Sequence, residues 1–241
     1  MPNTTTTPIT PGVYLVDKPE GPSSHTLVNY FRRLSGIKRV GHTGTLDPLA
    51  SGLLIILVGR EFTKLQSQYL KKDKTYLVTA KLGFTTDSYD RTGQVTSRTD
   101  WKSVSAIEKA TVEKALKEFR GCINQTVPIF SAVKIAGQKL YDKARRGESV
   151  TLPSRQVTIH QLKLISFKKD VKNKNLHCTL EVACSSGTYI RSLVHDLGRK
   201  LGVGAHVTSL RRTKIDKFHV KKAMVIDLAK IKIKKDPDIL T

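Results

Sequence analysis

The chain has 241 residues, of which 39% are hydrophobic and 26% are charged, a composition that allows a sizeable core in one large domain or two small ones. Lysine and arginine outnumber aspartate and glutamate by 42 to 20, and the formal net charge of +22 favours a polyanionic partner, with nucleic acid ahead of anionic membrane. The longest apolar run covers residues 53–58, which is too short to span a bilayer.

The cysteines and histidines predict neither a disulfide framework nor a metal site. The three cysteines are odd in number, and Cys178 and Cys184 fall on one face of an alternating segment, as small apolar residues of a reducing compartment do. None of the seven histidines forms a close pair with metal-ligand spacing. Residues 1–8 lack the charged and apolar regions of a secretory signal, so we expect a cytoplasmic protein without a bound metal.

The first part of the chain is predicted to hold a leader, a strand, a helix and a buried strand. Residues 1–11 are expected to be disordered, and residues 12–17 to form a strand. The helix is expected over residues 24–35, with Ser23 or Ser24 as N-cap and Gly36 at its end. Its buried stripe is predicted to be Leu27, Val28, Phe31 and Leu34. The apolar run 53–58, followed by Gly59, is typical of a buried strand.

The middle of the chain is predicted to alternate between strands, loops and helices. Residues 74–83 alternate as a strand and residues 85–93 are expected to be a loop. A capping box at residues 105–108 opens a predicted helix that continues to Gly121. An extended segment at 127–132 and a short helix at 138–146, stopped by Gly147, complete this region.

The last third is predicted to contain a hairpin, a helix and a final strand. Strands over 157–167 and 176–184 flank a solvated tip at 168–175, and a helix runs from Gly187 and Thr188 to Leu201. Residues 205–212 are expected to be a core strand, and residues 214–241 a basic tail with a short helix near 226–229. Because strands and helices mix without strict βαβ alternation, we expect an α+β fold with a mixed, mostly antiparallel sheet flanked by helices.

The segment before the buried strand, GHTGTLDPLASG at residues 41–52, presents one carboxylate from a stiff loop. Glycines at 41, 44 and 52 permit positive φ or close backbone approach, and Pro48 pushes Asp47 away from helical conformation. An aspartate before proline in such a turn is most often structural, with its side chain capping backbone amides. Catalysis by Asp47 is the alternative.

This segment, with the run VYLVDKPEGPSS at residues 13–24, resembles the TruB family of tRNA pseudouridine synthases, and the resemblance extends from about Gly12 to Lys214. The resemblance implies the pseudouridine synthase fold with a central active-site cleft. It also implies an isomerase that converts uridine 55 in the T loop of tRNA to pseudouridine, with Asp47 at the position of the catalytic aspartate.

Two further segments carry the resemblance and imply site residues. Lys74-Thr75-Tyr76 matches the segment whose tyrosine stacks on the target base, although strand propensity alone favours a packed strand residue at Tyr76. Residues 185–193, SSGTYIRSL, match the segment that supplies the arginine paired with the catalytic aspartate, which is Arg191 here. A guanidinium offers a carboxylate two parallel charge-assisted hydrogen bonds, whereas a solvated surface arginine is the simpler alternative.

The same matching implies four contacts with the substrate. Tyr189 and Leu210 are expected to line the uridine pocket, His42 to occupy the place vacated by the flipped base, and Lys18 to make a phosphate or structural contact. A loop histidine such as His42 is more often only solvated. A single carboxylate can act on the sugar or the base without redox change, so no cofactor is expected.

The expected protein is a monomer that acts on the T stem-loop of tRNA. Its predicted domains are a catalytic domain at residues 12–214 and a short basic extension at 215–241. Two alternatives remain, namely a guide-RNA-dependent relative and a non-catalytic RNA-binding or tRNA-folding protein. Such relatives carry a C-terminal PUA domain, for which the 29 residues after Arg212 are too few. The presence of Asp47, Tyr76 and Arg191 together favours an enzyme.

Overall fold

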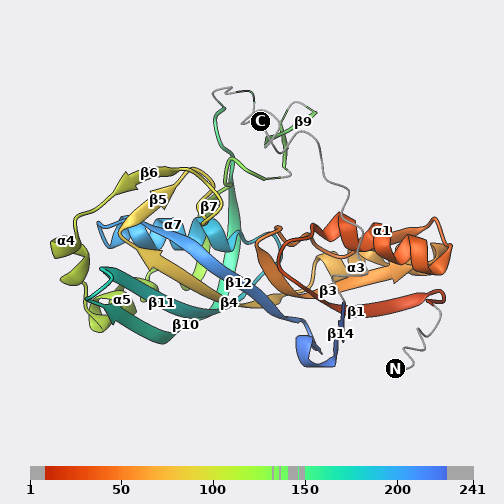
Figure 1. Cartoon of the computed structure of the whole chain (residues 1–241). Coiled ribbons are helices and arrows are strands. Elements are labelled where there is room, and N and C mark those ends of the chain that lie inside the picture. The colour runs from red at the N-terminus through yellow and green to blue at the C-terminus, as the bar shows by residue number, and fades with distance from the viewer. Residues whose placement is uncertain (1–8, 132, 136, 141–145, 147–149, 227–241) are drawn as a thin grey trace. The chain divides into compact units, whose positions relative to one another are not determined.

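The computed structural model of the chain describes residues 9–131, 133–135, 137–140, 146 and 150–226. The chain forms two compact units (Figure 1). The first consists of Met1–Lys72 and Arg211–Thr241, and the second of Asp73–Leu210. The predicted boundaries at residues 11 and 214 stay predictions.

The first unit is built on β3 (Ala50–Val58), which pairs antiparallel with β1 (Gly12–Lys18) and with β2 (Val40–His42). The strand order in this unit is β14-β1-β3-β12, in which β14 (Met224–Val225) runs parallel to β1. Only residues 211–215 of β12 (Ala205–Ile215) belong here. The remaining elements are α1 (Ser24–Ser35), α2 (Arg60–Thr63), α3 (Gln66–Leu70), β13 (Phe218–His219) and the 3₁₀ helix η1 (Val220–Lys222).

Strand β3 is buried on both faces, which explains its unbroken apolar run. Leu54, Ile56 and Val58 pack in a cluster with α1, whereas Leu53, Ile55 and Leu57 pack in a second cluster with Ile215 and Val220. Successive side chains of a strand point to opposite faces, so one strand supplies both clusters. The prediction of a buried strand is confirmed.

Helix α1 begins and ends where the capping residues predict. The Ser23 side chain accepts a hydrogen bond from the Thr26 N–H, and Gly36 adopts a left-handed conformation with φ of 70°. Leu27, Val28 and Phe31 are buried, but Leu34 is 44% exposed, so its predicted burial is wrong. Leu34 lies in the last turn, beyond the cluster in which the other three pack.

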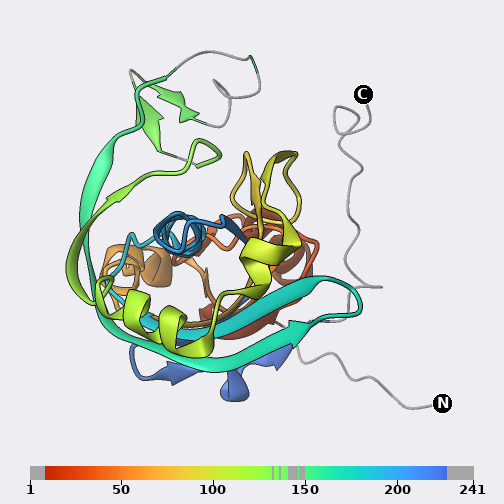
Figure 2. The ribbon, with the colours of Figure 1, turned by 90° about the vertical axis from the view of Figure 1, so that its left-hand side faces the viewer.

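The second unit contains a sheet of consecutive antiparallel neighbours. β4 (Lys74–Leu82) pairs with β11 (Asn175–Cys184), β11 with β10 (Ser154–Asp170), and β10 with β7 (Gly121–Thr126). Residues 205–210 of β12 continue this sheet beside β4. Figure 2 shows α7 (Ile190–Lys200) inside the curve that β7 and β10 form. The other elements are β5 (Phe84–Thr86), β6 (Val95–Arg98), α4 (Trp101–Ser105), α5 (Lys109–Lys117), β8 (Lys134–Ile135) and β9 (Gln138–Lys139).

The expected α+β class with a mixed, mostly antiparallel sheet is confirmed, whereas several local predictions are wrong. Ser105 does not open a helix but ends α4, and Asp100 caps α4 by accepting from the Ser103 N–H. Within the predicted helix over 105–121, only Lys109–Lys117 are a new helix, α5, which begins after Glu108 without a side-chain cap.

Four other segments differ from their predictions. Residues 121–126 form β7 because they pair with β10, and residues 84–86 and 95–98 pair with each other at the ends of the predicted loop. The hairpin tip shrinks to residues 171–174 because both strands extend toward it. Gln138–Lys139 form β9 rather than a helix, because they pair with β8. Residues 141–145 of that predicted helix, its predicted stop at Gly147, and residues 227–229 of the predicted tail helix lie outside the described residues.

Cys178 and Cys184 are both free and fully buried, as expected of small apolar residues. Burial raises the pKa of the Cys178 thiol to about 12 and that of Cys184 to about 11. Among the described residues, no helix has the length and apolar character needed to cross a membrane.

Candidate active site

The loop that carries Asp47 connects β2 to β3 and is held at Leu46 by the first residue of α1. The Ser24 hydroxyl donates to the Leu46 carbonyl at 3.0 Å and accepts from the Leu46 N–H at 2.8 Å. Ser24 is 1% exposed, so both bonds are sheltered from water. The residue before Asp47 is thus fixed through both of its backbone polar groups.

Arg212 holds the same loop at Gly44. Its Nη2 donates to the Gly44 carbonyl at 3.0 Å, and its Nε donates to the Leu53 carbonyl at 2.7 Å. The side chain is 1% exposed, and a buried guanidinium needs such acceptors because it brings five N–H donors out of water. Arg212 therefore ties the start of the loop to the strand that follows it.

Lys18 holds the loop at Pro48, the residue after Asp47. Its ammonium donates to the carbonyls of Pro22 at 2.8 Å, Pro19 at 2.9 Å and Pro48 at 3.4 Å, and the side chain is fully buried. The Gly21 N–H also donates to the Pro48 carbonyl, at 2.8 Å. Burial lowers the pKa of Lys18 to about 8, the Asp47 charge opposes this shift, and the Arg212 charge adds to it.

Asp47 itself is half-buried, and the residues on both sides of it, Leu46 and Pro48, have fixed backbones. The Asp47 carbonyl accepts a hydrogen bond from the Ala50 N–H at 3.0 Å, in the turn that leads into β3. The negative charge of the Asp47 carboxylate raises the pKa of the buried Lys18 ammonium, against the larger effect of burial. A carboxylate with a fixed backbone and a nearby cation can act as a nucleophile or base at one defined point.

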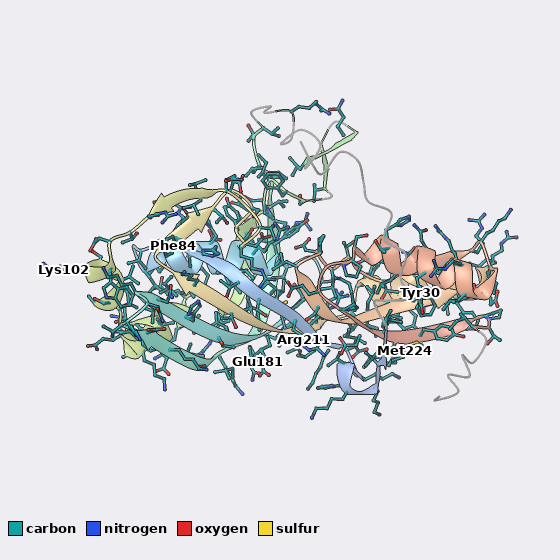
Figure 3. The ribbon with its side chains drawn as sticks, viewed as in Figure 1. Tyr30, Phe84, Lys102, Glu181, Arg211 and Met224 are labelled. Atoms are coloured by element: carbon teal, nitrogen blue, oxygen red, sulfur yellow. The ribbon has the colours of Figure 1, made fainter. Side chains whose placement is uncertain are left out.

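Arg211, the residue before Arg212 in β12, binds side chains of the two neighbouring strands β1 and β3. Arg211, labelled in Figure 3, donates from Nη1 to Asp17 Oδ1 at 3.0 Å and from Nη2 to Asp17 Oδ2 at 2.6 Å. Its Nη1 also lies 3.3 Å from the Ser51 hydroxyl. Adjacent strand residues point to opposite faces, so Arg211 and Arg212 make hydrogen bonds on the two different faces of β12 within this unit.

His42 lies in the same unit, at the end of β2. Its carbonyl accepts from Gln66 Nε2 at 2.7 Å, and its buried Nδ1 has no hydrogen-bond partner among the described residues. Burial lowers the pKa of the His42 ring, and the nearby charges of Arg212 and His25 lower it further. The structure thus favours a neutral imidazole with one unused polar atom.

Arg191 lies in the second unit, at the start of α7, and is not the solvated surface arginine of the simpler alternative. It is 5% exposed, and its Nη1 donates to the Ser88 carbonyl at 2.8 Å and lies 3.5 Å from Asp90 Oδ2. Its Nη2 donates to the Phe130 carbonyl at 2.9 Å. The pairing with Asp47 that the resemblance implies stays a prediction.

Asp90 is itself 3% exposed and is satisfied within its own loop. Its Oδ1 accepts from the Ser88 hydroxyl at 2.8 Å and from Thr92 through both the backbone N–H at 2.9 Å and the hydroxyl at 2.6 Å. This leaves Oδ2 toward Arg191. A buried carboxylate and a buried guanidinium with this many partners form a rigid group.

Tyr189 immediately precedes α7, and one buried side chain fixes its backbone. Gln125 donates from Nε2 to the Tyr189 carbonyl at 2.9 Å and accepts at Oε1 from the Tyr189 N–H at 2.8 Å. The Arg155 guanidinium lies 5.1 Å from the centre of the Tyr189 ring. The ring is therefore placed by contacts on its backbone and on its face.

Tyr76 and Leu210 are both buried strand residues of the second unit, 9% and 6% exposed. Tyr76 lies opposite Val182 in the β4–β11 pairing. This placement fits the packed strand residue that propensity favours. Base stacking by Tyr76 therefore stays a prediction.

The predicted site residues fall into two groups. Lys18, His42 and Asp47 lie in the first unit, and Tyr76, Tyr189, Arg191 and Leu210 lie in the second. The sequence did not identify four residues that hold these side chains or their loops in place. They are Ser24, which was expected only as a possible N-cap, and Asp90, Gln125 and Arg212. A signal existed for Arg212, since it occupies an inward position of an alternating strand, where a charged residue needs a buried partner.

A metal centre finds no support in the part of the chain that the structure describes, where no group of three or more His, Cys, Asp or Glu side chains could hold an ion. The prediction that the protein works without a metal or cofactor stays a prediction.

Comparisons with known proteins identify relatives across most of the chain. Residues 32–190 match the family model described as TruB family pseudouridylate synthase (N terminal domain), and residues 191–236 match that of the tRNA pseudouridylate synthase B C-terminal domain. The tRNA pseudouridine synthase B of Thermobifida fusca is 42% identical over 218 residues, which cover 90% of this chain and 73% of that protein. The tRNA pseudouridine synthase B of Haemophilus influenzae is 46% identical over 216 residues, which cover 90% of this chain and 66% of that protein.

A solved structure shares the fold. The crystal structure of a Cbf5-Nop10-Gar1 complex matches with a TM-score of 0.67 and 27% identity, over 89% of this chain and 52% of that one. This chain thus spans about half the length of that solved chain.

Proposed function

The chain belongs to the TruB family of pseudouridylate synthases, and from this premise we propose that it isomerises a uridine of transfer RNA to pseudouridine, at position 55 in the T loop. Its curated relatives carry the name tRNA pseudouridine synthase B. The position within tRNA and the T stem-loop as the recognised part come from the family resemblance.

The observation that carries this proposal is how Asp47 is presented. The carboxylate at the family's catalytic position lies in a loop whose residues Gly44, Leu46 and Pro48 are each bound by a different buried side chain. A structural turn needs no such triple support. A catalytic group does, because misplacement by about 1 Å can cost a hundredfold in rate.

The reaction asks for one carboxylate and a flipped base. The bond between N1 of uracil and C1′ of ribose breaks, the base turns, C5 joins C1′, and the proton lost from C5 is balanced by one gained at N1. No electron is gained or lost, so the chemistry needs no redox partner. We propose that Asp47 acts on the sugar or the base in this exchange.

We propose supporting roles for the other predicted residues. Tyr76 stacks on the target base, Tyr189 and Leu210 line its pocket, and His42 takes the place that the base leaves, as enzymes that flip a base require. Arg191 serves as the arginine of the catalytic aspartate, and the burial of its guanidinium, which the Ser88 and Phe130 carbonyls hold in place, supports such a role. For Lys18, its three carbonyl partners support a structural contact.

The decisive experiment is incubation of the purified chain with an unmodified tRNA transcript, followed by mapping of pseudouridine. Asp47→Asn should abolish turnover and keep RNA affinity, because the amide has the same shape but is neither a nucleophile nor a base. Asp100→Asn is the matched control, because it makes the same chemical change at the N-cap of α4, where asparagine can replace aspartate. Wild-type turnover by Asp47→Asn would remove Asp47 from the mechanism.

The same assay separates the alternatives. Activity of the protein alone argues against dependence on a guide RNA, and no modification under any condition would favour a non-catalytic RNA-binding protein. An isolated T-arm stem-loop should be modified nearly as well as whole tRNA. A stem-loop that reacts far more slowly would show that recognition extends beyond the T arm.

We further propose a cytoplasmic monomer that works without a metal. Light scattering coupled to gel filtration tests the monomer, and a dimer mass would contradict it. Rates should be unchanged after exhaustive chelation once tRNA folding is controlled, for example by using a stem-loop substrate whose folding does not depend on divalent ions.

A further inference from the structure

An aromatic contact outside the predicted site lies directly beside the partners of Arg191. The rings of Tyr89 and His195 are stacked, with centroids 3.9 Å apart and planes inclined by 17°. Tyr89 lies between Ser88 and Asp90, both of which contact Arg191 through its Nη1. His195 follows Arg191 by four residues on α7, so the two side chains project from the same face, one turn apart.

Helix α7 therefore holds one three-residue segment at two points. Arg191 binds the carbonyl of Ser88 and the carboxylate of Asp90, while His195 covers the ring of the residue between them. The segment is also fixed at its backbone, because the Val207 N–H donates to the Tyr89 carbonyl at 3.0 Å.

Tyr89 adopts a backbone conformation that an aromatic residue rarely takes. Its φ of 62° lies in the left-handed region, which is strained for a residue with a Cβ. A stacked aromatic pair contributes about 0.5–1.5 kcal/mol beyond its buried area. Stacking on His195 therefore helps to hold this strained turn.

We propose that Tyr89 and His195 are a positioning pair, whose stacking keeps the Ser88 carbonyl and the Asp90 carboxylate against Arg191 and so fixes the guanidinium for the isomerisation. The inference rests on the proposed function and deepens it. It concerns only contacts within the second unit. Neither residue of the pair is proposed to touch the substrate.

The test compares variants that remove the stack with variants that keep it. Tyr89→Ala and His195→Ala lose one ring, whereas Tyr89→Phe and His195→Phe retain two stacked rings. Tyr89→Gly loses the ring but takes the positive φ without strain. Each is assayed with tRNA under single-turnover conditions at saturating enzyme, and RNA affinity is measured separately.

We expect both alanine variants to slow the saturated rate about 2- to 13-fold, the factor that corresponds to the stacking energy. RNA affinity should change less than twofold, and both phenylalanine variants should keep the wild-type rate. The double alanine variant should be no slower than either single one, because the interaction is already lost. Tyr89→Gly should be as slow as Tyr89→Ala although it is more stable.

Three outcomes would overturn the pair's role. These are a wild-type rate in either alanine variant, a Tyr89→Gly rate equal to wild type, or phenylalanine variants as slow as the alanine ones. Amide hydrogen exchange over residues 86–92 gives a second readout that does not depend on activity. Exchange should be faster in Tyr89→Ala and restored in Tyr89→Phe. A wild-type protein that modifies no tRNA would instead refute the proposed function, whatever the variants do.

Discussion

Gly52 of β3 and Arg212 of β12 pass so closely that a Cβ at Gly52 would overlap the backbone carbonyl oxygen of Arg212. Gly52 also has a φ of 104°, which side chains with a Cβ rarely allow. Since Arg212 binds the carbonyl of Gly44, this contact sets how near β12 comes to the Asp47 loop. The glycine that ends the sequence motif is thus required by packing as well as by backbone conformation.

Gly52→Ala should lower the free energy of unfolding by about 2–4 kcal/mol, since overpacking against backbone adds to the conformational strain. Gly21→Ala is the matched control, because its φ is 110° but nothing lies within 4 Å of an added Cβ. The control should lose only the strain term, about 1–2 kcal/mol. Urea denaturation measures both, and equal losses would show that the close approach contributes nothing.

Two adjacent serines at the start of α1 separate helix stability from loop position. Ser23→Ala removes the N-cap, and Ser24→Ala removes the hydroxyl that binds both backbone groups of Leu46. Each should cost about 1–2 kcal/mol of stability. Only Ser24→Ala should also slow the saturated single-turnover rate, because only Ser24 fixes the residue before Asp47. If the two variants react equally fast, the Ser24 bonds do not position the carboxylate.

Local patterns predicted those elements whose signals are local. The caps at Ser23 and Gly36 delimit α1, and the apolar run before Gly59 identifies β3, because each signal lies within the element. Strand β7 was missed because residues 121–126 show no alternation of their own and are strand only through pairing with β10. Ser105 resembled a cap, but Asp100 five residues earlier had already begun a helix.

The candidate site divides in the same way. Asp47 could be predicted because its glycines, its proline and the family motif are contiguous. Arg212 and Gln125 could not, since they bind Gly44 and Tyr189 from 168 and 64 residues away along the chain. Such contacts are set by which strands become neighbours, and no spacing within a single segment encodes that.

The buried ammonium of Lys18 should give the protein a pH-dependent stability in the alkaline range. Its pKa is about 8 in the folded chain against 10.5 for an unburied lysine. Between these values the unfolded chain binds more protons at this position, so the contribution of Lys18 to the free energy of unfolding rises with pH, by at most about 1.4 kcal/mol per unit.

Lys18→Met removes this group, so the stability of the wild type relative to Lys18→Met should increase from pH 8 toward pH 10. Urea denaturation at pH 7.5, 8.5 and 9.5 measures the difference. Lys163→Met, at an exposed position of β10, is the control for loss of a lysine. A difference between wild type and Lys18→Met that stays constant over this range would contradict the lowered pKa.

The last prediction concerns Gln125, whose amide makes two opposite hydrogen bonds with the backbone of Tyr189. Gln125 is 1% exposed, and removing its amide takes away the acceptor of the Tyr189 N–H, whereas the Tyr189 carbonyl still accepts from the Leu193 N–H at 3.1 Å. Gln125→Met keeps the side-chain volume and should lower the free energy of unfolding by about 1–3 kcal/mol. Gln125→Glu should be worse, because its carboxylate can accept from the N–H but would face the Tyr189 carbonyl oxygen with no proton to donate. Gln156→Met, on the exposed part of β10, is the matched control and should be neutral.

If Tyr189 lines the uridine pocket, both Gln125 variants should also slow the saturated single-turnover rate at temperatures where they remain folded. Gln125→Glu with the stability and rate of the wild type would show that the amide does not orient Tyr189.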